Sequence, residues 1–575
     1  MPSAAPALAA LQAAVSSYEP HLQPSGELHD PVFGAPTQYG TAYHAFCQAV
    51  LAAHGPEGPR AAHLGRAARG LDAALRHVAD PSLPATLSAF RRDTGAATAG
   101  SHREFFWPPI LQTHALLAEL GHPAAAGWAR RIAAVEVLAS FGARPPSNWA
   151  MVWLYGEWLR LRLGLSPTTA EAFDRWLGGF FAGALLPEAG LYQEPGHPNS
   201  YDLFTRYHLA AVLAAGYAGA WRADLEGLME TGLRRSLGVQ LSDGSLASAH
   251  RSSGQTWTLG AQCAYFTAAA RFFRERDPAL ARRAEAAANL ALASFVRWQR
   301  PDGPYSPVEN LLPPAYRVGY EAYTADGHYG NLAMGLLAAA VRLGFRGGPA
   351  GADRPPGTHI ECDPTQRALA HHGRYSAQVN AWPAPQYDGF GLTDLTFGPG
   401  RYLHFASSVR HLSAPTAWYN LGLASRDRPG LGELRPLAQE AMLPLGPIEA
   451  APTGAGLHLR ARARGSAHTY DLRLTIDQAG VDVAEELPGR VGPVSLLVPY
   501  LRDCGLGPTT AVQVGRGVVR LRLGAEVIRL EVAGEVEAAL DLPHGYENRR
   551  GLCGLLRLDL AAPVAGIRYR VAVEA

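Results

Sequence analysis

Most of the first 345 residues repeat the apolar spacing of amphipathic helices. Tyr43, Phe46, Cys47, Val50 and Leu51 follow the i, i+3, i+4, i+7, i+8 rule, which places them on one helical face. The same spacing continues along the chain and predicts a long series of helices. These are expected over 61–78, 109–120, 123–141, 148–163, 167–186, 200–217, 222–241, 255–274, 278–299 and 328–343.

Proline and capping residues mark several of the expected helix starts. Pro123, Pro167 and Pro278 stand at first-turn positions, where a missing N–H costs nothing. Ser166 and Asp277 immediately precede two of these prolines and are predicted N-caps.

The expected helices alternate between two kinds. Segments such as 209–216 and 332–341 are apolar almost all round, as in a fully buried helix, whereas others carry arginines on one face, for example at Arg130–Arg131 and Arg282–Arg283. Longer loops precede the apolar member of each pair. The pattern predicts an N-terminal (α/α) toroid of about five and a half helical hairpins, with the apolar helices as its inner ring. Their starts are then expected to meet at one mouth.

Beyond the toroid the apolar period changes from 3.6 to 2. Residues 457–464, 518–523, 527–532 and 567–573 alternate apolar and polar side chains, which predicts antiparallel strands with one wet face. Many such strands with Gly/Pro turns predict a C-terminal antiparallel β-sandwich. The expected division is a lead-in segment over 1–38, a toroid over 39–345, a Gly/Pro-rich linker over 346–357 and a sandwich over 358–575.

Composition narrows the function. The chain has 575 residues, 47% of them hydrophobic and 18% charged, with a formal net charge of +1. This near-neutral balance argues against nucleic acid or an anionic membrane as a partner. The basic residues are all arginine, so lysine Schiff-base enzymes and P-loop NTPases are excluded.

The five cysteines are scattered without a CxxC pair, which argues against structural zinc and a disulfide framework. We expect no metal and no cofactor. The N-terminus has neither a basic region nor a long apolar core, and no stretch reaches a membrane-spanning length. A soluble protein is expected, cytoplasmic by default, with secretion left open and the oligomeric state undetermined.

Polar patches with candidate chemistry precede three of the apolar helices. Asn148 and Trp149 open one, Tyr201 stands at the start of the next behind His197, and Arg251 lies in the loop before the third. The further candidates in or near these loops and helix starts are Asn199, Arg206, Tyr207 and His250. Tyr320 and His328 belong to a further loop on the same face, before the last helix.

A helical toroid followed by a β-sandwich, with these residues at the mouth, resembles the polysaccharide lyases of the chondroitin/hyaluronate, alginate and heparinase II/III groups. The resemblance rests on the architecture and on a few residues: Asn148–Trp149 opening an inner helix, His197 lying 49 residues later and followed by a tyrosine, and Arg251 beyond an Asp-Gly-Ser turn. The chain departs from the pattern before His197, where the usual Asp-Gly-Ser is absent. The spacing from His197 to the following tyrosines is also irregular.

The resemblance implies metal-independent β-elimination on an acidic poly- or oligosaccharide that contains uronic acid. Asn148 and His197 would neutralise the uronate carboxylate, because the proton beside it is otherwise too weakly acidic. Tyr201 or Tyr207 would move the proton, with its pKa lowered by a nearby arginine. That arginine would be Arg251 or Arg206. Substrate-binding roles fall to Trp149, Asn199, Arg206, His250, Tyr320 and His328.

Two other functions stay open. A glycoside hydrolase on the same kind of toroid needs two carboxylates across the cleft, and the candidates are Glu157, Glu194, Asp202, Asp243 and Asp326. A non-catalytic carbohydrate-binding protein needs none. Structural roles are the alternatives for single residues: a helix cap for Asn148, a core ring for Tyr207 and core packing for most tryptophans near the helix starts.

Overall fold

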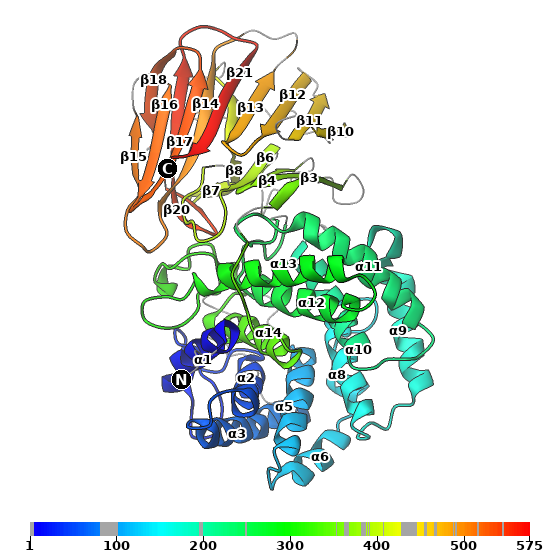
Figure 1. The fold of residues 1–575 in the computed structure, drawn as a ribbon. Helices are drawn as coiled ribbons and strands as arrows, with labels where there is room; N and C mark the ends of the chain where they lie inside the picture. The colour runs from blue at the N-terminus through cyan, green and yellow to red at the C-terminus, as the bar shows by residue number, and fades with distance from the viewer. Residues whose placement is uncertain are drawn as a thin grey trace.

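The structure is a computed structural model. It describes residues 5–80, 102–194, 199–247, 250–351, 354–361, 367–380, 387, 389, 391–405, 408–426, 446–452, 457–464, 469–486, 488, 492–513, 517–542 and 545–574. The chain folds into a helical part followed by antiparallel sheets, as the change of apolar period predicts (Figure 1).

Within the described residues, the apolar helices form a closed ring. Each one contacts the next, and the last contacts the first. In order around the ring they are α2 (Gly40–His54), α5 (Trp107–Glu119), α8 (Asn148–Arg162), α10 (Asn199–Ala214), α12 (Trp257–Phe273) and α14 (Asn331–Arg342). Nearly every residue of α12 and α14 is buried, because these helices pack on neighbours at both sides and on an outer helix as well.

The outer layer consists of the partner helices. They are α1 (Pro6–Tyr18), α3 (Arg60–Ala79), α6 (Ala125–Ala133), α9 (Ala170–Ala184), α11 (Arg222–Val239) and α13 (Pro278–Val296). Helix α1 contacts α2 and α14 and buries Leu11, Val15 and Tyr18. The segment expected to be a lead-in therefore supplies the outer helix that pairs with α14, and it completes the last hairpin of the toroid.

Two expectations about helix boundaries are wrong. The helix expected over 123–141 is interrupted: α6 ends at Ala133, and a separate α7 (Val137–Ser140) follows an extended Glu136. Ser166 does not cap a helix: its hydroxyl accepts from the Thr168 N–H at 2.9 Å in a turn before α9 and bonds the buried Glu157 carboxylate. Helix α9 begins at Ala170, where Thr169 is the cap.

Consequently Pro123 and Pro167 precede their helices by two or more residues and do not occupy first-turn positions. At α13 the prediction is confirmed. Asp277 accepts a hydrogen bond from the Leu280 N–H, and Pro278 is the first helical residue.

The C-terminal part contains two large antiparallel sheets packed on one core, as a sandwich requires. One has the strand order β10 (Gly446–Pro452), β11 (Leu457–Arg464), β12 (Thr469–Ile476), β13 (Val481–Glu486), β21 (Gly566–Val573), β17 (Glu526–Ala533), β16 (Val518–Leu523) and β15 (Thr510–Gln513). The other has the order β8 (Ala414–Tyr419), β7 (Val409–His411), β19 (Tyr546–Asn548), β20 (Gly551–Leu560), β14 (Val494–Asp503) and β9 (Gly422–Ser425), with β18 (Val536–Asp541) also paired to β20.

A smaller antiparallel sheet lies next to the toroid (Figure 1). It comprises β3 (Arg354–Glu361), β4 (Arg367–Gly373), β5 (Tyr375–Asn380) and β6 (Gly391–Thr396). Strand β3 contacts α11. Because β3 starts at Arg354, the segment expected to be a linker over 346–357 already contributes to this sheet.

Buried ion pairs join the toroid to the sheets. Arg550, in the turn before β20, bonds Asp243 at 3.2 Å, Glu309 at 3.1 Å and Asp394 at 3.2 Å. Arg297 contacts Asp243 from the toroid side at 2.9 Å. Burial by itself disfavours the carboxylate of Asp243, but the two guanidinium groups hold its pKa well below the ordinary value.

Candidate functional site

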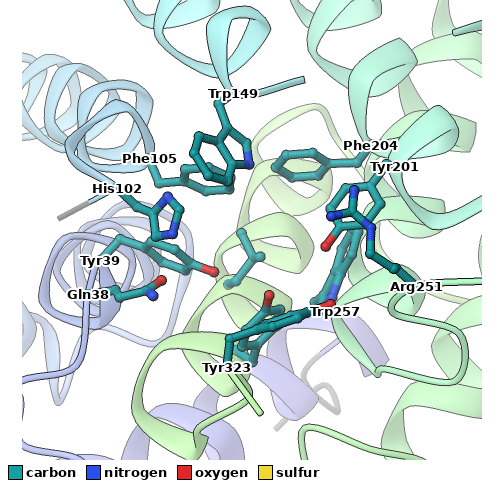
Figure 2. Close-up of a pocket in the computed structure, with 12 residues that line it drawn as sticks. Gln38, Tyr39, His102, Phe105, Trp149, Tyr201, Phe204, Arg251, Trp257 and Tyr323 are labelled. Carbon is teal, nitrogen blue, oxygen red and sulfur yellow. The ribbon is translucent and has the colours of Figure 1, made fainter. Parts of the chain in front are cut away.

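The candidate site is a cavity of about 100 Å³ at the mouth of the inner ring (Figure 2). All six inner helices contribute to it through residues at or just before their N-termini. The lining residues are Gln38, Tyr39, His102, Phe105, Trp149, Tyr201, Phe204, Arg251, Trp257, Tyr323, Tyr329 and Leu332. Converging helix N-termini present N–H groups and partial positive charge, which suits an anionic ligand.

Aromatic rings form much of the cavity wall. Phe105 stacks on Tyr39 with ring centroids 4.7 Å apart and on Phe204 at 5.7 Å. Trp257 meets Phe204 edge to face at 5.2 Å. Trp149 is 38% exposed, unlike the fully buried tryptophans of the toroid core. Apolar walls with a few polar groups are typical of small-ligand pockets, and the cavity has room for one ring-sized unit of a longer chain.

Tyr201 and Arg251 form one side of the cavity. The Arg251 guanidinium lies 4.9 Å from the centre of the Tyr201 ring. The Tyr201 hydroxyl shares a hydrogen bond with Ser252 Oγ at 3.0 Å, and the same Oγ bonds the Tyr323 hydroxyl at 3.1 Å. Burial and the Glu321 carboxylate raise the pKa of Tyr201 above its ordinary value, although Arg251 opposes the shift. Tyr201 is therefore a neutral phenol at neutral pH.

Asn148 and Arg251 meet on a carboxylate beside the cavity. The Asn148 amide and the Arg251 guanidinium both donate to Glu194. Burial raises the pKa of Glu194, and the two donors act in the opposite direction. The helix cap at this position is Ser147, whose hydroxyl accepts from the Ala150 N–H at 3.0 Å. The Asn148 side chain is thus not used for capping.

His102 lies across the cavity from Arg251 (Figure 2). It immediately precedes the short helix Arg103–Phe106 that leads into α5, and its φ of 42° is in the left-handed region. Its ring meets Trp149 edge to face with centroids 4.3 Å apart. Burial lowers the pKa of His102, so the imidazole is neutral at neutral pH.

Tyr207 lies outside the cavity, in the toroid core. It is 3% exposed, and its ring meets His208 edge to face at 4.8 Å. Burial and the neighbouring Tyr155 and Tyr43 raise its pKa well above the ordinary value. Tyr207 is six residues beyond Tyr201 on α10, so it is almost two turns deeper in the ring.

Arg206 and Asn199 also face away from the cavity. Arg206 donates to both oxygens of Asp202, at 2.9 and 2.7 Å, and to the Gly232 carbonyl of α11 at 2.9 Å. Asn199 accepts from Arg235 at 3.0 Å. Both residues therefore join α10 to α11 and are not available to a ligand.

His250 and Tyr320 line a second cavity, of about 290 Å³, between the toroid loops and the sheets. Tyr323 borders both cavities. The remaining lining residues of the second cavity are Ser253, Gly319, Glu321, Ala322, Tyr387, Ser408, Arg410, Glu547, Asn548 and Arg549. The two cavities are therefore neighbours, and the second is built by both parts of the chain.

Two more sequence candidates complete the set. His328 is fully buried, with Nε2 at 3.0 Å from the Tyr323 carbonyl and its pKa held well below the ordinary value by burial. It supports the cavity from behind Tyr39, whose ring it meets at 5.3 Å. His197 lies outside the described residues.

Most of the carboxylates considered for a hydrolase are held in buried ion pairs. Glu157 contacts Arg160, Asp202 contacts Arg206, Asp243 contacts Arg297 and Arg550, and Asp326 contacts Arg300. Glu194 is paired as well, but its partner Arg251 is a residue that lines the cavity. Glu321, which the sequence pattern did not single out, accepts a hydrogen bond from the Ser252 N–H. Because the Ser252 hydroxyl bonds Tyr201, Glu321 is linked to Tyr201 through Ser252.

Several cavity residues were missed from the sequence. The residues concerned lie just before inner helices, as the predicted site residues do. They are Tyr39, His102, Phe105 and Tyr329. The polar patches marked three helix starts, and Tyr320 and His328 marked the loop before α14. The starts of α2 and α5 carried no such patch. Within the described part of the chain, no group of three or more His, Cys, Asp or Glu residues has the arrangement of a metal site. None of the described helices combines the length and apolarity needed to cross a membrane.

No protein-family model matches the chain, and no curated protein sequence does either. Among solved structures, a chondroitin AC lyase from Streptomyces coelicolor A3 in complex with chondroitin sulphate aligns with a TM-score of 0.48 and 14% identity, covering 100% of this chain and 80% of the other. A heparinase III structure aligns with a TM-score of 0.39 and 9% identity, covering 99% and 84%.

An unsaturated glucuronyl hydrolase from Bacillus sp. GL1 aligns with 57% of this chain and 94% of its own, at a TM-score of 0.34 and 13% identity. An endoglucanase CelQ from Clostridium thermocellum complexed with cellotriose aligns with 100% of this chain and 93% of its own, at a TM-score of 0.33 and 11% identity. The chain is thus distantly similar in structure to lyases and to hydrolases, at low sequence identity.

Proposed function

We propose that this protein is a polysaccharide-acting enzyme, and specifically a lyase that cleaves a uronic-acid-containing glycan by β-elimination. The observation that carries the proposal is the pairing of Tyr201 with Arg251 in an aromatic cavity at the inner-helix N-termini. The cavity combines a proton-transfer group, a cation and rings that suit a sugar face. An acidic poly- or oligosaccharide is the substrate class that uses all three.

Elimination removes the proton on the carbon beside the uronate carboxylate and expels the sugar oxygen linked at the neighbouring carbon. Charge must be drawn onto the carboxylate as the proton leaves. We assign this role to Arg251, which lines the cavity, and to the Asn148 amide, which shares the Glu194 carboxylate with it. In the described structure both donors hold Glu194. A substrate carboxylate would therefore share or replace Glu194 as their partner.

Tyr201 is the tyrosine that we assign to proton transfer. Its hydroxyl borders the cavity, whereas the Tyr207 hydroxyl is enclosed by the core. Arg206, the arginine considered for lowering the pKa of Tyr207, is paired with Asp202.

The direct test is a screen of uronate polymers and oligomers, with neutral glycans of the same linkages as controls. A lyase creates a C4–C5 double bond conjugated with the carboxylate, so its product absorbs in the near ultraviolet. We expect this absorbance to rise with at least one uronate substrate and with no neutral glycan. New reducing ends without absorbance would contradict the lyase proposal.

A glycoside hydrolase is the second candidate, and one observation favours it. Two carboxylates, Glu194 and Glu321, both lie near Tyr201 and Arg251, and the raised pKa of Glu194 is what a general acid needs. In a hydrolase, Glu194→Gln would abolish turnover. In a lyase it would leave kcat nearly unchanged, so this variant separates the two reactions on any active substrate.

A further inference from the structure

The outer face of the eight-stranded sheet carries a groove of about 610 Å³ that the proposed reaction leaves unused. Its lining residues belong to β11, β12, β13, β17 and β21, and it shares none of them with the two cavities at the toroid. Figure 1 shows these strands at the end of the molecule away from α3 and α6. The groove is therefore a separate place where a ligand can bind.

The strand register places Arg568 within this groove. Side chains of β21 alternate between the two faces of the sheet, so Tyr569 packs in the sandwich core and Arg568 is exposed on the outer face. Arg568 lies opposite Ala484 of β13 on one side and Ala533 of β17 on the other. These two small side chains leave the long arginine without neighbours of its own height. A ligand in the groove can therefore reach the guanidinium from either side.

The other arginines and carboxylates of the groove already have partners. They form ion pairs on the sheet face: Arg473 with Glu486, Arg570 with Asp482, and Glu531 with Arg529 at 2.8 Å. Within the described residues, the Arg568 guanidinium has neither an ion pair nor a hydrogen bond. Its charge is therefore the one that an incoming anion can take as a partner.

The remaining polar groups of the groove suit a long hydrophilic anion. The guanidinium presents a planar fork of N–H donors that matches a carboxylate or a sulfate. Thr475 of β12 and His458 of β11 lie opposite each other and line the groove further across the sheet. Because neighbouring strands are about 4.8 Å apart, the groove offers hydrogen-bonding groups over roughly 14 Å from β21 to β11. A chain of several sugar rings has this length.

The carboxylates of the groove favour a glycan over nucleic acid. Double-stranded DNA carries one negative charge for about every 1.7 Å of its axis, so Asp482 and Glu531 would face several of its phosphates. An acidic glycan carries its charges on separate sugar rings. One ring can place its acidic group on Arg568 while sugar hydroxyls donate to the two carboxylates.

We propose that this groove is a second binding site for an acidic glycan chain and that Arg568 binds an acidic group of the chain. The choice of glycan rests on the proposed function, but the groove takes no part in the reaction. A polymer long enough to occupy both places is held by the groove while another stretch of it enters the toroid. Binding at one place then raises the local concentration of the polymer at the other.

The test is affinity electrophoresis of the full-length chain in native gels that contain alginate or chondroitin sulphate. Dextran is the neutral control, and duplex DNA is the control for any polyanion. Every protein carries Tyr201→Phe, so that the polymer stays intact. To this background we add Arg568→Gln, Arg568→Lys or, as the matched control, Arg522→Gln. Arg522 is an exposed arginine of the same sheet that lies outside the groove, opposite Val527 and near the other end of β17 from Ala533.

We expect the background protein to be retarded in at least one of the two uronate gels and not by dextran. Arg568→Gln should raise the apparent Kd roughly two- to fivefold, because a single exposed charged contact contributes modestly. Arg568→Lys should keep most of the retardation, and Arg522→Gln should keep all of it. In the active chain, Arg568→Gln should raise KM for the polymer and leave KM for the shortest active oligomer unchanged.

The inference is overturned if neither uronate gel retards the background protein, or if Arg568→Gln is retarded as strongly as the background. An equal loss with Arg522→Gln would also overturn it, since the effect would then be one of net charge. Retardation by duplex DNA that depends on Arg568 to the same degree would show a surface for any polyanion and not a glycan site. These outcomes do not depend on turnover. If no uronate substrate yields an ultraviolet-absorbing product, the proposed function fails, whereas a groove that still binds alginate or chondroitin sulphate through Arg568 stands.

Discussion

At the scale of single residues, the position of a side chain along its helix decides whether it can serve the site. Tyr201 and Tyr207 both belong to α10, yet one borders the cavity and the other is enclosed by the core. Arg251 and Arg206 show the same contrast, since Asp202 and the α11 backbone occupy Arg206 completely. A residue type suited to catalysis is therefore not sufficient. Access to the mouth of the ring is required as well.

The two tyrosines give a paired prediction. Tyr201→Phe should lower kcat by roughly 10²–10⁴ on a natural uronate substrate, because a general acid is lost. Tyr207→Phe should retain near-wild-type kcat and change the free energy of unfolding by no more than about 1–2 kcal/mol. Steady-state kinetics and denaturant unfolding of both variants provide the measurement. A dead Tyr207→Phe enzyme with a normal fold would contradict this assignment.

Glu194 predicts a pH dependence of substrate affinity. Its pKa lies above the ordinary value of 4.5, mainly because of burial. As the pH rises through this raised pKa, Glu194 becomes charged and competes with the substrate carboxylate for Arg251 and Asn148. We expect KM to rise over that window while kcat changes little. Glu194→Gln should have a lower KM at neutral pH and should lack the dependence.

The raised pKa of Glu194 also determines how the free energy of unfolding changes with pH. A carboxyl group whose pKa is higher in the folded state favours folding when protonated, and this contribution is lost as the pH rises through the folded pKa. Thermal melts of wild type and Glu194→Gln should therefore diverge toward higher pH, with the glutamine variant relatively more stable. If the wild type instead gains stability on the variant over this range, the pKa of Glu194 is lowered by folding and not raised.

At the scale of elements, buried charged residues join neighbouring helices of the toroid. Asp202 receives Arg206 from its own helix and Arg235 from α11, and the three charges are buried. The guanidinium groups outweigh the effect of burial, and the pKa of Asp202 stays below its ordinary value. Removing Arg206 leaves Asp202 paired with Arg235 alone. It also leaves the buried Gly232 carbonyl and the Ser236 and Tyr265 hydroxyls without this donor, which costs stability.

Arg206→Met should accordingly lower the free energy of unfolding by about 3–5 kcal/mol. The same substitution at Arg251, whose side chain is 38% exposed, should lower it by less than about 1 kcal/mol. Arg251→Met should instead raise KM for the uronate substrate. Urea unfolding followed by circular dichroism, together with kinetics, tests the pair. If the two variants have similar free energies of unfolding, the buried charges do not stabilise the contact between α10 and α11.

At the scale of the whole molecule, the toroid and the sheets share buried charges. Asp243, Glu309 and Asp394 surround Arg550, and Arg549 adds a further contact to Asp394 at 2.5 Å. The second cavity lies directly beside this network and includes Arg549 itself. The orientation of the two parts therefore sets the shape of the second cavity, which shares Tyr323 with the candidate site.

Disrupting the network should uncouple the two parts. Asp394→Asn leaves Arg549 and Arg550 with one negative partner fewer inside the interface. We expect calorimetry to resolve two unfolding transitions where the wild type has one, and KM for long substrates to rise more than KM for the shortest active one. The matched control is Asp482→Asn, which affects a half-exposed ion pair between Asp482 in β13 and Arg570 in β21, within one sheet. It should keep the single unfolding transition of the wild type.

The sequence by itself determined the architecture, because helical and strand periods are local properties of the chain. It located the inner helices and placed Trp149, Tyr201 and Arg251 where the described structure brings them together. It could not show that the helix expected over 123–141 is interrupted or that Ser166 serves Glu157. Both involve buried partners outside the segment itself: Arg160 donates to the carbonyls of Ile132 and Val135 at the interruption, and Glu157 accepts from Ser166.

Only the tertiary structure decided the composition of the site. Closure of the ring brings His102, Tyr201 and Tyr323 to one cavity although long stretches of chain separate them. It also turns Tyr207 into the core, and α11 takes Arg206 out of reach. Periodicity fixes which face of a helix is buried, but the neighbours of that face are set by packing between distant segments. Which side chains line the candidate site, and their charge states, follow from those neighbours.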